Sequence, residues 1–265
     1  MEDTATPPAV APLSEFPHTE VGSLPSLLPD TPWTTTALQA CERRTARAWV
    51  DNADAPQCVA VLLPGDPELA RPPVAFVFGT DAPADALVAW VGEQARPLDV
   101  VCDDDIGLRL LAAHPEATVT DMAARWFERL DAIDRPESSA VRRLRLRDAE
   151  AVEALAIPDL LGAFESLKDL LMVGGASAVV EDGHIAAAAF TVDQSVNYAR
   201  ILAYTEPDRR REGLALAACR HLVAAHHEQG RLACALVAAG DAAAQGLARA
   251  IGFESASRVR RYRLG

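Results

Sequence analysis

The chain has 265 residues, 50% of them hydrophobic and 24% charged, which is the composition of a soluble protein with a core to bury. Its formal net charge of -13 at pH 7 argues against a nucleic-acid backbone as a partner. No stretch approaches the run of about 18 apolar residues that crosses a membrane, and no signal peptide is recognisable, so we expect a cytoplasmic protein without a membrane partner.

The length and the proline distribution predict three parts. Residues 1–30 are rich in proline and poor in aromatic residues, so we expect a flexible tail. The polar stretch 131–140, which contains Pro136, marks a boundary. We therefore expect an N-terminal α/β domain over residues 31–137 and a C-terminal domain over residues 138–265.

Hydrophobic periodicity predicts alternating helices and strands in the N-terminal domain. The predicted helices cover residues 32–50, 82–95 and 105–114, and the predicted strands cover residues 57–63, 73–79, 98–102 and 118–130.

The C-terminal domain has the predicted order β-α-α-β-β-β-α-β-α-β. Asp148 is expected to cap a helix, and Asp182-Gly183 is a hairpin signal. The predicted elements are an edge strand at 141–147, helices at 149–156 and 158–172, a strand pair over 177–190, a strand at 197–205, a helix at 213–230, a strand at 232–238, a helix at 241–251 and a strand at 257–264.

The five cysteines are scattered and form no CxxC pair, which predicts reduced thiols in the core and no zinc site. His221, His226 and His227 share one predicted helix without an Asp or Cys partner nearby in the sequence. This favours a solvated helix face over a metal site.

Three arginines, Arg209 to Arg211, precede Gly213 where a strand passes into a helix. The first turn of a helix has amides without an internal partner and a partial positive charge, and both favour phosphate oxygens. The turn therefore predicts a site for a diphosphate or a phosphorylated cofactor. The alternative is a solvated helix start whose arginines balance Glu206, Asp208 and Glu212.

Residues 141–265 resemble the GNAT acyltransferase superfamily. The stretch from Arg210 to Ala215 matches its phosphate-binding signature, which is Gln or Arg, two variable residues, Gly, one variable residue, and Gly or Ala. Leu247, Gly252 and Phe253 match its late helix, N-x-x-S-x-x-L-Y-x-x-x-G-F. The subgroup most similar in organisation is that of the zwittermicin-resistance-type acetyltransferases.

The resemblance implies a GNAT fold with a mixed central sheet after a smaller α/β domain, and acetyl-CoA as co-substrate without a metal. The pantetheine would pair with the strand at Ala203, Tyr204 and Thr205. The rest of the implied cofactor site comprises Arg210, Arg211, Glu212, Gly213, Leu214, Ala215 and, in place of the family's usual asparagine, Asp241.

The catalytic residues are less evident. Ala248 stands where many members have the tyrosine that protonates the leaving thiolate, so Tyr204 or a water is our candidate acid. Glu206 is our candidate base, because it is the carboxylate at the end of the central strand. The alternative is that Glu206 pairs with Arg209 or Arg210. Amides of residues 203–205 would stabilise the tetrahedral oxyanion.

Residues 32–130 repeat the order strand, helix, strand, helix of the C-terminal half. We interpret them as a degenerate second copy, without the arginines and glycine of the phosphate turn, that covers the sheet and walls the acceptor pocket. The alternative is an unrelated α/β domain.

These observations predict an N-acetyltransferase for a primary amine on a small molecule, acting as a monomer or homodimer. Two alternatives stay open: a non-catalytic acyl-CoA-binding regulatory module, and an acetyltransferase for protein amines.

Overall fold

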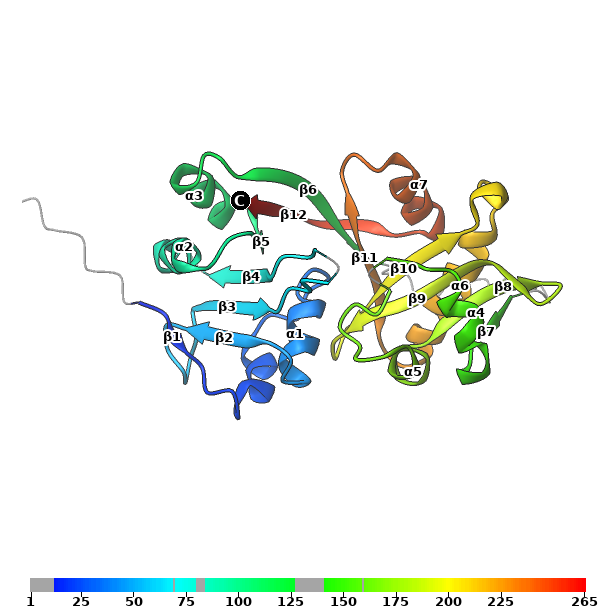
Figure 1. Cartoon of the computed structure of the whole chain (residues 1–265), viewed down its shortest axis with the longest axis horizontal. Coiled ribbons are helices and arrows are strands. Elements are labelled where there is room, and N and C mark those ends of the chain that lie inside the picture. Colours follow the sequence, from blue (N-terminus) through cyan, green and yellow to red (C-terminus); the bar gives the residue numbers. More distant parts are fainter. Residues whose placement is uncertain (1–11, 69, 80–83, 127–140, 159) are drawn as a thin grey trace, which may run out of the picture. The chain divides into compact units, whose positions relative to one another are not determined.

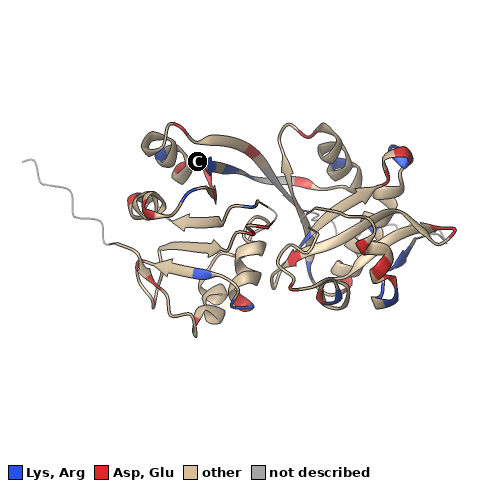
Figure 2. Cartoon of the chain, in the orientation of Figure 1, with Lys and Arg blue, Asp and Glu red and all other residues tan. Residues whose placement is uncertain are grey.

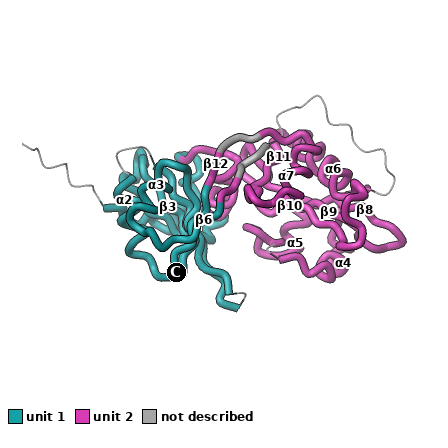
Figure 3. Tube along the Cα trace, turned by 90° about the horizontal axis from the view of Figure 1, so that it is seen from above, with its two compact units in different colours: residues 1–27, 41–120, 260–265 teal, residues 28–40, 121–259 magenta. Residues whose placement is uncertain are grey.

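The computed structural model describes residues 12–68, 70–79, 84–126, 141–158 and 160–265. The chain forms two compact units, which Figure 3 colours separately. Unit 1 comprises Met1–Leu27, Cys41–Thr120 and Arg260–Gly265, and unit 2 comprises Leu28–Ala40 and Asp121–Val259. Both units therefore combine segments from distant parts of the sequence. The predicted boundary at residues 131–140 lies outside the described residues.

The described part of unit 1 contains a mixed sheet that carries two helices (Figure 1). Its strands follow the order β1 (Ser14–Glu15), β2 (Arg47–Val50), β3 (Cys58–Leu63), β4 (Val74–Gly79), β5 (Leu98–Cys102) and the end of β12 (Glu254–Leu264). β4 and β5 are parallel, because helix α2 (Ala84–Glu93) connects them as a crossover. Helix α3 (Asp104–Ala113) packs with α2 on the same core, where Leu87, Leu98 and Leu110 are buried.

Unit 2 contains the remaining strands, which also pair in a mixed arrangement. Its strands follow the order β6 (Thr118–Trp126), β11 (Leu232–Ala238), β10 (Tyr198–Thr205), β9 (His184–Gln194), β8 (Ala176–Glu181) and β7 (Val141–Arg143). The pair β10 and β11 is parallel and is joined by helix α6 (Leu214–Glu228), and the other described pairs are antiparallel.

The sheet of unit 2 separates two cores. Ala189 and Ile201 belong to a core with α6 and helix α7 (Ala242–Ile251). Their neighbours Phe190 and Leu202 belong to a core with helix α4 (Ala149–Glu153), the short helix α5 (Leu167–Asp169) and the π-helical turn η3 (Leu170–Gly174). Successive strand residues face opposite sides, so one strand supplies both cores. This mixed α/β architecture confirms the predicted fold class.

The last strand of each half of the sequence pairs with a strand from the other half. β6 follows α3 along the chain but pairs with β11, from Met122 opposite Ala238 to Trp126 opposite Cys234. β12 follows α7, and its end pairs with β5.

Two arginines of β12 hold the buried carboxylate of Asp99 on β5. Arg261 Nε donates to Asp99 at 3.0 Å and Arg263 Nη2 donates at 2.7 Å. Burial raises the pKa of Asp99, but the hydrogen bonds from Arg263 and Arg261 outweigh burial, so this pKa lies below its ordinary value. The paired charge fixes the register of β12 against β5, because another register would leave the carboxylate buried and unpaired.

The predicted flexible tail is wrong for the described residues 12–30. Ser14 and Glu15 pair with Val50 and Trp49, and the 3₁₀ helix η1 (Val21–Leu27) buries Val21 and Leu24 completely. The apolar side chains between the prolines bury themselves in the core and hold the segment in place. A prediction from proline content alone does not take these side chains into account. Residues 1–11 of the expected tail lie outside the described residues.

The predicted helix over residues 32–50 is also wrong in its second half. Helix α1 covers Thr35–Glu42, Arg44 adopts a left-handed φ of 57°, and β2 begins at Arg47. The backbone of residues 47–50, which the hydrophobic periodicity assigned to a helix, forms its hydrogen bonds with β3 instead.

The predicted helix over residues 158–172 begins later than expected. Gly162 has a φ of 55°, and a Cβ there would lie 2.0 Å from the carbonyl oxygen of Val192. The amide of Ala163 donates to the same oxygen at 2.9 Å. This close approach to β9 requires an irregular segment, and the helix starts only after Ser166, whose hydroxyl accepts from the amide of Asp169.

The remaining predicted elements are confirmed to within a few residues. The predicted hairpin at Asp182 and Gly183 is confirmed between β8 and β9, and both residues have left-handed φ values. All five cysteines are buried and free. In the described part of the chain, no helix is long and apolar enough to cross a membrane, and no group of three or more His, Cys, Asp or Glu side chains is placed to hold a metal ion.

Candidate functional site

The turn between β10 and α6 presents unpaired backbone amides. Gly213 is the N-cap of α6 with a φ of 83°, and Arg211 is also left-handed with a φ of 69°. The amides of residues 211–216 form no hydrogen bond to any residue that the structure describes, and the first bonded amide is that of Ala217, 3.1 Å from the Gly213 carbonyl oxygen. Such amides, together with the helix dipole, attract an anion.

Gly213 is open to its surroundings. A Cβ at this position would meet no atom within 4 Å, so the positive φ, and not crowding within the chain, requires glycine here. The exposed turn is therefore accessible to a ligand.

The three arginines of this turn have different surroundings. Arg209 pairs with Glu181 at 2.8 Å and with Glu212 at 2.9 Å. Among the described residues, Arg210 and Arg211 have no ion-pair or hydrogen-bond partner for their guanidinium groups, and both line a groove. Figure 2 shows the basic and acidic residues together at this turn. The turn thus offers two uncommitted positive charges beside unpaired amides.

β10 and β11 separate along their length. They pair from Tyr198 opposite Leu232 to Arg200 opposite Cys234, and no further pair between them occurs in the described strands. Beyond Arg200, β10 still pairs with β9 as far as Thr205, and β11 still pairs with β6 as far as Ala238. A bulge at Val192 of β9 accompanies this divergence, because the register shifts between Arg200 and Ile201.

The separation leaves one edge of β10 open. The amide of Glu206 donates to Ala186, and hydrogen-bonded residues alternate along an antiparallel pair. Tyr204 therefore bonds with β9, while Ala203 and Thr205 direct their N–H and C=O groups toward the open edge. An extended amide-containing ligand could pair with these two residues as an added strand would.

The open edge and the turn belong to one groove of about 1190 Å³. Its lining comes from β10, the turn, the start of α6, β11 and one side of α7. Ala248 of α7 lies in this lining and is almost fully buried, with Leu247 and Phe253 nearby in the same core. The groove is long and largely apolar beside β10 and α7, and cationic at the turn.

Asp241 also lines the groove, and its carboxylate has a structural partner. It caps α7 by accepting a hydrogen bond from the amide of Ala244 at 2.9 Å. The residue is therefore placed at the predicted cofactor site while its side chain holds the start of α7.

The two candidate catalytic residues lie differently. Tyr204 lines the groove, and its ring packs partly against the core of α4 and η3. Glu206 is absent from the described residues that line the groove, and its backbone begins the 3₁₀ turn η4 (Pro207–Arg209). Of the predicted cofactor residues 210–215, the lining includes all but Glu212.

The residues that sequence reasoning missed lie at the closed end of the groove. Arg200 lines the groove where the strands separate and pairs with Asp193, whose side chain is fully buried. Thr36 of α1 donates to the same carboxylate at 2.7 Å. No short motif marks these residues, because Thr36 is brought to β9 by the tertiary fold.

The N-terminal segment Leu28–Ala40 continues this contact along the β9–β10 hairpin of unit 2. Asp30 accepts from the Ser195 hydroxyl at 2.6 Å and from the amide of Asn197 at 2.9 Å. Gln39 accepts from the amide of Gln194.

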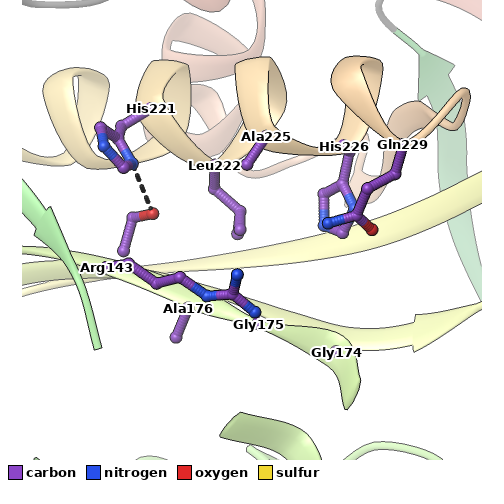
Figure 4. Close-up of a pocket in the computed structure, with 10 residues that line it drawn as sticks. Arg143, Gly174, Gly175, Ala176, His221, Leu222, Ala225, His226 and Gln229 are labelled. Atoms are coloured by element: carbon purple, nitrogen blue, oxygen red, sulfur yellow. Dashed lines mark hydrogen bonds between the residues drawn. The ribbon is translucent and has the colours of Figure 1, made fainter. Parts of the chain in front are cut away.

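A second, small cavity lies between α6 and β8 (Figure 4). Its volume of about 20 Å³ has room for a water molecule and excludes a substrate. His221 contacts Ser177 at 2.9 Å, and His226 is buried with its Nε2 2.7 Å from the Thr191 hydroxyl. The expectation of a solvated histidine face is therefore wrong for His226, because the side chain turns into the core.

Comparison with known proteins agrees with this geometry. The GNAT acetyltransferase family model matches residues 127–262. A comparison with curated proteins found no match.

Several solved structures are similar in fold. A GCN5-related N-acetyltransferase-like protein from Streptococcus suis is 19% identical, with a TM-score of 0.61, over 93% of this chain and 97% of that chain. A GCN5-related N-acetyltransferase from Sphaerobacter thermophilus is 15% identical, with a TM-score of 0.64, over 98% and 96%. A tandem GNAT protein from the clavulanic acid biosynthesis pathway is 15% identical, with a TM-score of 0.60, over 95% and 98%.

Proposed function

The chain belongs to the GNAT acetyltransferase family, and on that premise we propose that it transfers an acetyl group from acetyl-CoA to a primary amine of a small molecule. The observation that carries the proposal is the continuous groove between the open edge of β10 and the unpaired amides of the β10–α6 turn. Acetyl-CoA has a diphosphate for the turn and two amide groups in its pantetheine arm for the strand edge.

The diphosphate would accept hydrogen bonds from the amides of residues 211–215, with Arg210 and Arg211 supplying opposite charge. The pantetheine amides would pair with Ala203 and Thr205. This arrangement would bring the thioester to the closed end of the groove, near Arg200.

In the proposed reaction, the amine nitrogen attacks the thioester carbonyl carbon. A C–N bond forms, the carbonyl oxygen gains negative charge, and the C–S bond then breaks to release the CoA thiolate. The N–H of Ala203, the nearer of the two residues to the closed end of the groove, would stabilise the oxyanion, which leaves its carbonyl oxygen and Thr205 to hold the pantetheine. The amide of Tyr204 points to β9, so it does not contribute to this stabilisation.

Two proton transfers complete the reaction. An alkyl amine with a pKa near ~10 must lose a proton before it attacks. Glu206 is our candidate to take this proton. Its side chain is not part of the groove lining, and it follows the end of β10 that is far from Arg200, so a chain of several waters would have to carry the proton to it. Tyr204 would give a proton to the thiolate, which is a tolerable leaving group even without an acid because thiols have a pKa near ~8.5.

Three experiments test the proposal. Calorimetric titration should show acetyl-CoA binding to wild type, and absence of binding at millimolar ligand would end the proposal. Release of CoA thiol should accelerate when members of an amine panel are added. Tyr204→Phe should lower kcat and leave the Kd for acetyl-CoA unchanged.

A non-catalytic acyl-CoA-binding module is the second candidate. Ala248 stands at the position of the family's tyrosine acid and is buried in the groove lining, and Glu206 lies outside that lining. Tight acetyl-CoA binding without amine-dependent CoA release across the panel would favour this second function.

We also propose that residues 32–130 are a degenerate copy of the C-terminal half, and that the chain belongs to the zwittermicin-resistance-type subgroup. The order β4, α2, β5, α3, β6 along the first half corresponds to β10, α6, β11, α7, β12 along the second, with a parallel pair in each. A binding stoichiometry of one acetyl-CoA for each chain would support a single functional copy, and a stoichiometry of two would contradict it.

A further inference from the structure

The turn proposed to bind the diphosphate contains a carboxylate, which would repel that anion. Glu212 lies between Arg211 and Gly213, in the middle of the unpaired amides. A carboxylate a few ångströms from a bound diphosphate would repel it by an energy comparable to that of a favourable ion pair. The turn therefore needs a way to hold this charge apart from the ligand.

Arg209 provides the contacts that hold Glu212. Its Nε lies 2.9 Å from one carboxylate oxygen of Glu212, and its Nη2 also pairs with that group at 2.9 Å. Its Nη1 pairs with Glu181, at the end of β8, at 2.8 Å. One planar guanidinium thus joins the turn to the neighbouring hairpin.

The groove lining shows the consequence of these contacts. Arg209, Arg210, Arg211 and Gly213 line the groove, whereas Glu212 is absent from the lining among the described residues. Because Arg209 holds Glu212, the charges of Arg210 and Arg211 remain to match the two phosphates. Arg209 has its charge committed to two carboxylates, so it differs from its neighbours in role.

We infer that Arg209 is a positioning residue for acetyl-CoA, which holds the Glu212 carboxylate out of the groove and offsets its charge. This inference rests on the proposed function. It assigns the phosphate charge to Arg210 and Arg211, and it assigns to Arg209 the removal of a repulsion within the turn.

A rescue experiment separates this role from direct phosphate contact. Arg209→Gln leaves Glu212 uncompensated, so the Kd and KM for acetyl-CoA should rise about ten-fold with kcat unchanged. Glu212→Gln alone should leave the Kd within about two-fold of wild type, because no charge then needs to be cancelled. The double variant should return to within about two-fold of wild type for the same reason.

Arg47→Gln is the matched control, because Arg47 forms an ion pair with Glu15 through its Nε and Nη2, as Arg209 does with Glu212, but on strands of unit 1. Its acetyl-CoA affinity should equal that of wild type. Exposed pairs of this kind contribute little to folding, so all the variants should fold.

The outcomes distinguish the possible failures. A double variant that binds as weakly as Arg209→Gln would overturn the inference, because Arg209 would then act on the ligand or on the backbone directly. An unchanged Kd in Arg209→Gln would overturn it as well. Wild-type protein that fails to bind acetyl-CoA would instead remove the proposed function, and this inference with it.

Discussion

Arg200 and Cys234 form the last residue pair between β10 and β11 in the described strands. Past this pair each strand keeps only its outer neighbour, so the inner edge of β10 faces a groove. The same groove reaches the unpaired amides before α6. The edge of β10 and the start of α6 thus line one continuous groove. The proposed binding of acetyl-CoA requires this groove to be open.

Filling the open edge should weaken cofactor binding strongly. Ala203 is exposed, lines the groove and directs its backbone toward the open edge. Ala203→Trp should raise the Kd for acetyl-CoA by about 100-fold, because the indole would occupy space that the pantetheine needs. Calorimetry measures the change, and thermal unfolding should show little loss of stability.

Ala250→Trp is the control for this substitution. Ala250 is also exposed but is absent from the groove lining among the described residues. Equal losses of affinity in the two variants would show that tryptophan acts through general damage, and the groove would lose its assigned role.

A matched pair of glycines tests the turn. Gly213 and Gly230 have φ values of 83° and 77°, and an added Cβ at either position meets no atom within 4 Å. Alanine at either should therefore cost about 1–2 kcal/mol of backbone strain. Gly213→Ala should also weaken acetyl-CoA binding by about ten-fold, because its methyl group stands where the diphosphate would approach the amides.

Gly230→Ala should keep wild-type affinity, since Gly230 follows the other end of α6. Chemical denaturation and calorimetry on both variants give the comparison. If Gly213→Ala also binds acetyl-CoA as tightly as wild type, the diphosphate does not lie on this turn.

Local chemistry made the start of α6 predictable from the sequence. Gly213 supplies the left-handed cap, Gly230 follows the helix end, and the strand before the turn alternates between two cores. The hairpin at Asp182 and Gly183 was predictable for the same reason, because both residues tolerate the positive φ that the turn requires. These features depend on a few neighbouring residues.

Long-range pairing could not be predicted in this way. The contact of Asp99 with Arg263 spans most of the chain, and nothing in the pattern of β12 indicates a partner in unit 1. The contact between Thr36 and Asp193 has the same character. The hydrophobic periodicity around Gly162 predicts a helix, but the backbone there lies against Val192 and is not helical. Val192 is distant in the sequence, so this contact could not be predicted from the local pattern.

Two adjacent threonines on α1 should respond differently to the same substitution. Thr36 donates to the buried carboxylate of Asp193, whereas the buried hydroxyl of Thr35 has no hydrogen-bond partner in the described structure. Thr36→Val should lower the free energy of unfolding by about 1–3 kcal/mol, because it removes a bond to a buried charge. Thr35→Val should be neutral or stabilising, since it replaces an unsatisfied hydroxyl with a methyl group.

Urea denaturation of the two variants measures this difference. Thr36→Ser keeps the hydroxyl and should recover most of the loss. Equal effects of valine at both positions would show that the Asp193 contact does not stabilise the N-terminal segment on unit 2.

The buried His226 should make stability depend on pH. Burial, with the nearby positive charges of Arg231 and His227, lowers its pKa to about 4, whereas the unfolded chain has a histidine pKa near ~6.5. Between these values the unfolded chain binds a proton that the folded chain rejects. The stabilisation is therefore complete above about pH 6.5, and about 3 kcal/mol of it is lost as the pH falls to about 4. His226→Gln should remove this part of the pH dependence, measured by urea unfolding at several pH values, and the exposed control His184→Gln should retain it. Identical pH slopes for His226→Gln and wild type would show that the histidine is not held neutral by the fold.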